Sequence, residues 1–419
     1  MMIVDELLCR HTSIGARVSH PLRWMLEHGA LALHWSLRIM FFIAMAAIIA
    51  SSFSACANPF QPKADHKTIA ANTAIAINSS LSTPLRCPQV QGNTAPQSFV
   101  EKDGTHFIYQ HMPLKLYGYT FYRGPSHWQM PSFTQEIDAA LTMGTQAGQN
   151  LARPTDFWDK RSPDQQIEDA TIWRNMDYLV CSARLRGIFV VMDISAFRWL
   201  LVSKGRDPYD FSNWKAFLDE VGMHYSNQSS IAFYSITGEP NPPKTAKDTR
   251  HLVDFYRAVT DELSKSDKNH HLITAGGFNH MEEETPQTPW WHEIYALPHN
   301  DIIAFKTYSQ KDLNLIPTIA SFAKQLGKPM VDEEFGLPQR MGDAAPTGET
   351  YNEILTGRAQ FFEQVYTLGE ENGVSSFVFW DMGCELAQGS YQVSSKTPAV
   401  WRVIQAHAPN KVGGLGECK

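Results

Sequence analysis

The chain has 419 residues, of which 43% are hydrophobic and 11% aromatic, and its formal net charge is −7. This length and apolar content suffice for one large core, and a barrel-type domain alone uses a few hundred residues. The mild acidity, with no basic stripe interleaved with aromatic residues, argues against a nucleic-acid-binding protein.

The N-terminal region carries an apolar segment that is typical of export. Residues 39–50 read IMFFIAMAAIIA, which is shorter than the roughly 20 residues that span a membrane but fits the hydrophobic region of a signal peptide. The stretch FSAC that ends at Cys56 resembles a bacterial lipobox, in which the cysteine is lipidated. We expect an exported protein in the periplasm, at the cell surface or in the medium. Ordinary secretion, an uncleaved anchor and a buried core helix are the alternatives to a lipoprotein.

The composition divides the chain into three parts. Residues 1–56 form the leader, and residues 57–98 are rich in Ala, Asn, Ser, Thr, Pro and Gln without a sustained apolar period. Such a composition predicts a flexible tether. Residues 99–419 then form one folded domain.

The six cysteines predict disulfide chemistry at the ends of the domain rather than a metal site. Cys9 and Cys56 belong to the leader, whereas Cys87 and Cys418 flank the domain. Cys87 and Cys418 could pair in an oxidising compartment. Cys181 lies in a helical pattern, where we expect a buried free thiol. No spacing among the cysteines suggests zinc.

From about residue 105, short β-branched or aromatic runs alternate with longer amphipathic ones. Eight runs are predicted strands: residues 115–122, 150–154, 188–195, 231–239, 271–278, 302–309, 329–336 and 375–383. Helical patterns lie between or after most of them, at residues 166–186, 214–225, 251–264, 318–326, 351–368 and 400–406. Repeated strand–helix units predict a parallel sheet with right-handed crossovers, and eight units make a (β/α)8 TIM barrel. A doubly wound open sheet is the second choice, but no glycine-rich phosphate loop follows the first strand.

The active site of a (β/α)8 barrel lies at the C-terminal ends of its strands. Glycoside hydrolysis needs one carboxylic acid to protonate the leaving oxygen and one carboxylate to attack the anomeric carbon, with an aromatic floor for the sugar. An arginine beside a carboxylate lowers the pKa of that carboxylate and keeps it ionised. The predicted strands end in such an inventory: Tyr119, Thr120, Tyr122, Arg153, Asp193, Ser195, Glu239, Phe278, Lys306, Tyr308, Glu334, Trp380 and Asp381.

Motifs in the order of the barrel strands resemble glycoside hydrolase family five, the cellulase and β-mannanase family of clan A. GEPNPP after the fourth strand and KPMVDEEFG at the seventh are similar to its acid/base and nucleophile signatures. GQNLARPTDFW resembles its second strand, LVCSARLRGIFVVMDIS its third, IIAFKTYS its sixth and SSFVFWDMG its eighth. The resemblance covers nearly the whole folded domain. It implies these roles: Glu239 as acid/base, Glu334 as nucleophile, Arg153 and Tyr308 as partners of Glu334, and Trp380 as the sugar platform.

The chain departs from the family pattern at two positions. Gly238 stands where the family has an asparagine that contacts the sugar 2-hydroxyl, and Lys306 stands where it has a histidine. Loss of the asparagine implies a slower enzyme, another sugar preference or no catalysis. Lys306 would bring a cation into the cleft, which suits an acidic or substituted sugar.

The seventh strand carries three successive acids. Side chains of a strand alternate between its two faces, so Asp332 and Glu334 are expected on one face and Glu333 on the other. The family resemblance selects Glu334 as the nucleophile. Glu333 is then a partner that faces a helix or a loop, with a role as the nucleophile as the alternative.

Four tryptophans follow predicted strands. Trp290 and Trp291 come after the fifth strand, and Trp128 and Trp158 lie just past the first and second. Exposed indoles at these places would form outer sugar subsites, because a flat aromatic face stacks on a sugar ring. Packing at the start of a helix is the alternative for each.

The sequence therefore predicts an exported, monomeric (β/α)8 glycosidase that cleaves a β-mannan or β-glucan, as polysaccharide or oligosaccharide, by double displacement. No metal or cofactor is expected, since no His-x-His or His-Glu-x-x-His spacing occurs. Contact with a membrane would run through the N-terminal segment or a lipidated Cys56. The alternative is a catalytically degenerate, surface-tethered carbohydrate-binding barrel, which Gly238 and Lys306 favour.

Overall fold

The computed structural model describes residues 98–123, 127–155, 170–285, 288–338, 348–384 and 390–409. The leader, the tether up to residue 97, Trp158 and the pair Cys87 and Cys418 lie outside these residues, so the expectations for them stay predictions. None of the helices in the described part is long and apolar enough to cross a membrane.

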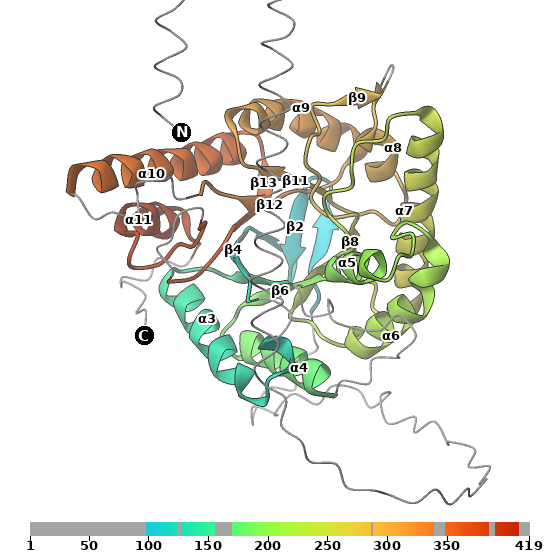
Figure 1. The fold of residues 1–419 in the computed structure, drawn as a ribbon, viewed down its shortest axis with the longest axis horizontal. Coiled ribbons are helices and arrows are strands. Elements are labelled where there is room, and N and C mark those ends of the chain that lie inside the picture. The colour runs from blue at the N-terminus through green and yellow to red at the C-terminus, as the bar shows by residue number, and fades with distance from the viewer. Residues whose placement is uncertain are drawn as a thin grey trace, which may run out of the picture. The chain divides into compact units, whose positions relative to one another are not determined.

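Eight parallel strands form a barrel (Figure 1). In the sheet they follow the order β11, β12, β13, β4, β5, β6, β7, β8, and β8 and β11 meet through a parallel bridge between Phe278 and Phe305. All eight predicted strands are confirmed, and the doubly wound alternative is wrong. Their bounds are β4 (Leu116–Phe121), β5 (Leu151–Pro154), β6 (Phe189–Asp193), β7 (Ile231–Ser235), β8 (Leu272–Thr274), β11 (Ile303–Thr307), β12 (Met330–Phe335) and β13 (Val374–Phe379).

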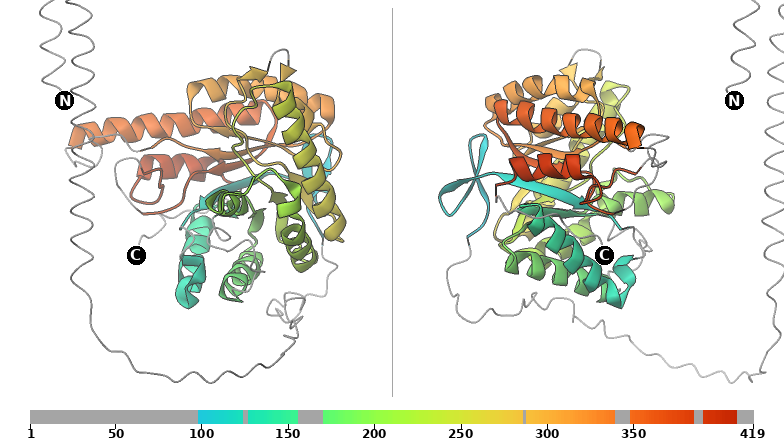
Figure 2. Two further views of the ribbon diagram at one scale, coloured as in Figure 1. Left: turned by 45° about the vertical axis from the view of Figure 1, so that its right-hand side comes forward. Right: turned by 90° about the vertical axis from the view of Figure 1, so that its left-hand side faces the viewer.

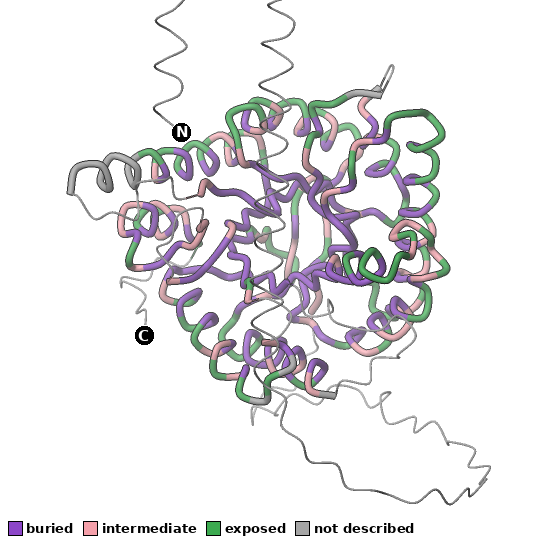
Figure 3. The backbone as a smooth tube through the Cα atoms, in the orientation of Figure 1, coloured by how far each residue is buried: buried purple, intermediate pink, exposed green. Residues whose placement is uncertain are grey.

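Helices surround the barrel and turn their buried sides toward it (Figure 3). Three described helices, α3, α5 and α8, were not predicted from the periodicity. Helices α5 and α8, with 8 and 5 residues, are too short to show a clear helical repeat. The helices are α3 (Thr134–Gln146), α4 (Ala170–Leu185), α5 (Ala196–Ser203), α6 (Lys215–Tyr225), α7 (Ala246–Ser266), α8 (Trp291–Tyr295), α9 (Gln310–Leu326), α10 (Gly348–Glu371) and α11 (Pro398–His407).

Helices α7 and α9 begin well before their predicted starts at residues 251 and 318, because side-chain caps fix their first turns. In α7, Thr245 and Asp248 form a reciprocal capping box, which satisfies two otherwise unpaired backbone N–H groups. In α9, the side chain of Ser309 accepts a hydrogen bond from the Asp312 backbone. The helix then continues through Pro317, although proline removes one internal hydrogen bond.

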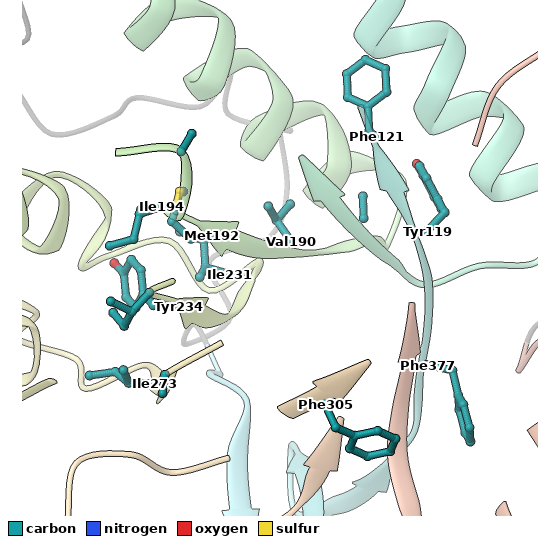
Figure 4. Close-up of a cluster of buried hydrophobic side chains, with 14 of the residues drawn as sticks. Tyr119, Phe121, Val190, Met192, Ile194, Ile231, Tyr234, Ile273, Phe305 and Phe377 are labelled. Carbon is teal, nitrogen blue, oxygen red and sulfur yellow. The ribbon is translucent and has the colours of Figure 1, made fainter. Parts of the chain in front are cut away.

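The alternation of side chains divides the barrel into an outer and an inner apolar cluster. The outer cluster lies between strands and helices, and Figure 4 shows part of it, including Tyr119, Val190 and Met192. The inner cluster contains the first inward-facing residues of the strands, such as Leu151 and Val191. The next inward positions along these strands are polar. The barrel interior is therefore apolar toward the N-terminal ends of the strands and charged toward their C-terminal ends.

An antiparallel sheet of three short strands, which was not predicted, packs at the N-terminal end of the barrel. It consists of β1 (Glu101–Asp103), β2 (His106–Tyr109) and β3 (Met112–Leu114), and it extends from one side of the barrel in the right-hand view of Figure 2. Phe107 is fully buried in the inner cluster and stacks on Phe233 with 6.2 Å between ring centres. This sheet covers the end of the barrel opposite the charged mouth.

Both described cysteines, Cys181 and Cys384, are disulfide-bonded. The prediction of a free thiol at Cys181 is therefore wrong. A helical pattern indicates that a cysteine is buried, but it does not reveal which other cysteine the fold brings to it. Disulfides persist in oxidising compartments and are rare in the cytosol.

Phe107→Ala should lower the free energy of unfolding by about 3–5 kcal/mol, because it removes a fully buried ring and leaves a cavity. Urea denaturation followed by fluorescence measures this change. Met112→Ala, on the same sheet but with a residue 66% exposed, is the control and should change stability by less than about 0.5 kcal/mol. A loss below about 1 kcal/mol for Phe107→Ala would contradict the packing role of the small sheet.

Candidate active site

A pocket of about 290 Å3 lies at the C-terminal ends of the barrel strands. It brings together six of the residues predicted for the site, and the described residues contain no cluster of His, Cys, Asp and Glu that could hold a metal ion. Its lining is Arg153, Thr155, Ser195, Arg198, Trp199, Gly238, Glu239, Lys306, Tyr308, Glu334, Trp380 and Tyr391.

Glu334 is a buried carboxylate near the end of β12. It forms ion pairs of 2.6 Å with Arg153 and of 2.6 Å with Lys306, and the Tyr308 hydroxyl donates to its Oε2 at 2.7 Å. Burial opposes ionisation, yet the two cations and the hydroxyl lower the pKa of Glu334 to about 2. Glu334 is thus an anion at neutral pH, as a nucleophile must be.

Tyr308 remains a hydrogen-bond donor at neutral pH. Burial, followed by the adjacent Glu334 carboxylate, raises the pKa of the Tyr308 hydroxyl well above its usual value. The side chain follows β11 and reaches across to Oε2 of Glu334. It therefore fixes the orientation of the carboxylate without sharing its charge.

Arg153 is the centre of a buried ion cluster beneath the pocket. It contacts Asp193 at 2.5 Å, Glu333 at 3.8 Å and Glu334 at 2.6 Å. Asp193 in turn accepts a hydrogen bond of 2.8 Å from the backbone N–H of Ser195. A buried charge is costly unless it is paired, so these contacts lock the guanidinium in one orientation beside Glu334.

Glu239 follows β7 and is half-buried at the pocket wall. Its Oε1 accepts hydrogen bonds of 2.9 Å from both Lys306 and Asn279. Its backbone is left-handed, with a φ of 58°, which is uncommon for a residue other than glycine. Arg198 supports this conformation by donating to the carbonyl oxygens of Glu239, at 2.9 Å, and of Gly238.

Both carboxylates contact the same nitrogen atom. Lys306 Nζ lies 2.9 Å from Oε1 of Glu239 and 2.6 Å from Oε1 of Glu334. These two distances place the carboxylate oxygens no more than 5.5 Å apart. Glycosidases that retain anomeric configuration hold their carboxyl groups about 5–5.5 Å apart, whereas inverting ones need about 6.5–9.5 Å.

The expected alternation of acids along β12 is wrong. The pairing with β11 slips so that Phe305 faces Asp332 while the next residue, Lys306, faces Glu334. This bulge turns both Glu333 and Glu334 toward Arg153. Asp332 instead lies on the helix side of β12, where it interacts with Tyr366 of α10. Burial there raises the pKa of Asp332 well above the usual value. Glu333 is therefore inside the barrel and does not face a helix. It accepts a hydrogen bond from the backbone N–H of Gly277 in the loop after β8, and burial raises its pKa.

Gly238 lies where a side chain does not fit. A Cβ atom there would be 2.7 Å from the carbonyl oxygen of Gly277. The ends of β7 and β8 approach each other closely at these two glycines. The asparagine of the family pattern would therefore need a shift of the backbone as well as a change of residue.

Two aromatic residues form the exposed walls of the pocket. Trp380 is partly exposed, lies 5.5 Å from the ring of Tyr122 and is joined to Asp381 by a cis peptide bond. Trp199 in α5 is 50% exposed, and its indole lies under the Arg198 guanidinium at 4.5 Å. Flat faces of this kind suit a sugar ring.

Three predicted subsite tryptophans, Trp128, Trp290 and Trp291, are fully buried, so the prediction that they bind substrate is wrong. They fill space between the barrel and its helices, where their rings pack on other aromatics. The indole of Trp128 donates to the Thr155 carbonyl and that of Trp291 to the Met281 carbonyl. For these three tryptophans the alternative expectation holds, namely that they pack in the interior near the start of a helix.

Sequence reasoning missed five residues of the site: Thr155, Arg198, Trp199, Asn279 and Tyr391. Arg198 and Trp199 lie in the run FRWLL directly after the third strand, and that position was a signal that could have found them. Asn279 follows Phe278, which was recognised as a strand end. Tyr391 gave no signal, because it comes from a segment far beyond the eighth strand.

Comparison with solved structures identifies the architecture. The endo-1,4-β-mannanase of Rhizomucor miehei is 17% identical with a TM-score of 0.58, and the match covers 74% of this chain and 99% of that chain. A glycoside hydrolase family 5 mannosidase of the same organism is 14% identical with a TM-score of 0.56, covering 75% and 98%. The fold is that of family five, clan A glycoside hydrolases.

The β-mannanase of the blue mussel Mytilus edulis has the same family five fold at 13% identity, with a TM-score of 0.53 and coverage of 77% of this chain and 99% of that chain. No protein-family model matches the sequence, and no curated protein matches it. The resemblance in the strand motifs is therefore confirmed at the level of the fold.

Glu334 should make the stability of the protein depend on pH between 4.5 and 2. Its pKa falls from 4.5 to about 2 on folding, so in this range the unfolded chain binds a proton that the folded chain does not. The resulting stabilisation, about 3 kcal/mol, is complete above pH 4.5 and is lost as the pH falls through 2.

Urea denaturation of the wild type and of Glu334→Gln from about pH 6 to about pH 2.5 measures this contribution. On acidification, the difference in the free energy of unfolding between the two proteins should shrink by most of this contribution of about 3 kcal/mol. Glu283→Gln, at an exposed residue, should follow the wild-type curve. A difference that stays constant with pH would show that Glu334 is not held ionised by the fold.

Proposed function

We propose that the protein is a retaining β-glycoside hydrolase with Glu334 as nucleophile and Glu239 as acid/base. The observation that carries the proposal is the separation of their carboxylate oxygens, at most 5.5 Å, in a pocket of a family five fold. This spacing suits direct attack on the anomeric carbon and leaves too little room for the water molecule of an inverting enzyme.

The two carboxyl groups have different environments, as the two roles require. Glu334 is buried among two cations and a hydroxyl, which keep it ionised for attack. Glu239 is half-buried at the pocket wall, and its Oε1 accepts the hydrogen bonds from Asn279 and Lys306. Its Oε2 is the atom we assign to carry the proton to the leaving oxygen and later to accept a proton from water.

The remaining wall residues would bind the sugar. Arg153 and Tyr308 hold Glu334 in the orientation for attack. Trp380 is assigned as the platform under the sugar at the reaction centre, and Trp199 with Tyr391 as walls of neighbouring subsites. No step of this mechanism needs a cofactor.

The substrate we propose is a β-linked mannan or glucan. The solved structures named above are described as a β-mannanase or mannosidase, which favours mannan over glucan. An open pocket with exposed indoles is compatible with an extended chain of sugars. A monomer suffices, since both proposed catalytic residues come from one chain.

We also propose that the protein is exported. The disulfides of Cys181 and Cys384 favour an oxidising compartment, and the leader with its apolar segment supplies the signal. Lipidation of Cys56 would hold the enzyme at a membrane.

The purified protein should release reducing sugar from β-mannan, from β-glucan or from both, and little from a β-xylan control. Glu334→Gln should lower kcat/KM by roughly 10³-fold or more, because it removes the nucleophile. Proton NMR during hydrolysis should show the β-anomer of the product first, since double displacement retains configuration.

Three results would count against this function. Early appearance of the α-anomer would exclude retention. Equal activity of Glu334→Gln would exclude its role as nucleophile. Binding of the polymer without any release of sugar would favour the degenerate carbohydrate-binding barrel.

A further inference from the structure

Lys306 reaches the centre of the pocket along a path that Gly277 leaves open and Gly238 borders. The Lys306 side chain starts on β11. Near its base, a Cβ atom added at Gly277, after β8, would lie 3.0 Å from Lys306 Cγ. Farther along, a Cβ atom at Gly238 would lie 3.5 Å from Lys306 Cε. The methylene groups therefore pack on bare backbone, and the side chain is only 4% exposed. Its ammonium group is held in place and does not sweep through solvent.

The ammonium group joins the two proposed catalytic residues. Among the described residues, Lys306 is the cation with ion pairs to both Glu239 and Glu334. Arg153 pairs with Glu334, and its other ion pairs are to Asp193 and Glu333. Loss of Lys306 would thus leave Glu334 with one cation and Glu239 with none from the described part of the chain.

We propose that Lys306 is a shared catalytic cation that stays paired with the negative charge as this charge moves from Glu334 to Glu239 and back. The inference rests on the proposed function and adds a role that the family pattern, with a histidine there, does not provide. A fixed cation aimed at developing charge lowers a barrier without reorganisation during the reaction.

The charge moves because each step changes both carboxyl groups. In the first step Glu334 forms a bond to the anomeric carbon, the bond from that carbon to the leaving oxygen breaks, and this oxygen takes the proton of Glu239. Glu334 is then a neutral ester and Glu239 a carboxylate. In the second step a water oxygen bonds to the anomeric carbon, the ester bond breaks, and Glu239 takes a proton from the water.

Lys306 touches an oxygen of whichever group carries the charge, so its ion pairing persists through both steps. Other charged or titratable groups also lie around the Lys306 ammonium group. They are Arg153 on β5, Tyr308 directly after β11, Glu333 and Glu334 on β12, and Glu239 after β7.

Lys306→Met tests the proposal, because methionine keeps most of the chain volume and removes the charge. The acidic limb of the profile of kcat/KM against pH should move to higher pH, since Glu334 loses one of the two cations that lower its pKa. On the polymer substrate kcat/KM should fall about 100-fold.

A 2,4-dinitrophenyl glycoside separates the charge effect from damage to the fold. Its leaving group departs without a proton, so Glu239 need not become a carboxylate in the first step. The loss in kcat/KM for Lys306→Met on this substrate should therefore stay below about tenfold.

Lys328→Met is the matched control, since Lys328 is a second buried lysine that donates to three backbone carbonyls, of Tyr295, Leu297 and Asn300. This variant should lose stability and leave both limbs of the pH profile in place. As a second variant, Lys306→Cys should regain activity and the original acidic limb after alkylation with 2-bromoethylamine, which restores an ammonium at nearly the same reach. Wild-type protein treated in the same way shows any effect on other groups.

The proposal of a shared cation would be overturned if Lys306→Met lost equal factors of kcat/KM on the polymer and on the dinitrophenyl glycoside while the acidic limb of its pH profile stayed unmoved. Lys306 would then have a structural role. Failure of the alkylated Lys306→Cys protein to recover, when it is folded by circular dichroism, would also overturn it. A wild-type protein that cleaves neither substrate would instead contradict the proposed function itself, so the two failures are distinct.

Discussion

The buried ion cluster around Arg153 is the constraint on which the rest of the mouth of the barrel depends. Charges inside a protein are costly unless they are paired and hydrogen-bonded, and here one guanidinium contacts Asp193, Glu333 and Glu334. Each partner comes from a strand, so the barrel must close in register for the cluster to form. The apolar inner cluster and the small sheet that packs against it close the barrel below this ion cluster.

From this cluster follows the difference between the two glutamates of the pocket. Glu334 belongs to the buried network, and its pKa is lowered to about 2. Glu239 lies on a loop with a left-handed backbone, at the boundary with solvent. Two carboxyl groups in unlike environments can take unlike roles in one reaction. The barrel supplies the first environment, and the loop after β7, held by Arg198, supplies the second.

The two departures from the family pattern, Gly238 and Lys306, lie side by side where the segments after β7 and β8 approach each other closely. At Gly238 and Gly277 no side chain separates the backbones, and the chain of Lys306 occupies the space beside them. The backbone oxygen of Gly277 leaves no room for a side chain before Glu239. The pocket thus has a different arrangement of polar groups between the same two carboxylates, and this arrangement leads us to assign Lys306 a role in charge transfer.

The sequence by itself determined the architecture and the identity of the central residues. Eight apolar runs with polar ends sufficed for the (β/α)8 barrel, because strands buried on both sides are apolar along their length and their C-terminal ends meet at one mouth. Glu239, Glu334, Arg153 and Tyr308 could be placed there from their positions at those ends.

Only the tertiary structure decided which of the neighbouring side chains face the pocket. The β-bulge that turns Glu333 inward depends on pairing with β11, which strict alternation cannot anticipate. The burial of Trp290 and Trp291 depends on how a helix packs against the barrel, whereas Trp199 is exposed on a helix too short to show a period. These features arise from contacts between segments far apart in the chain, so no local pattern encodes them.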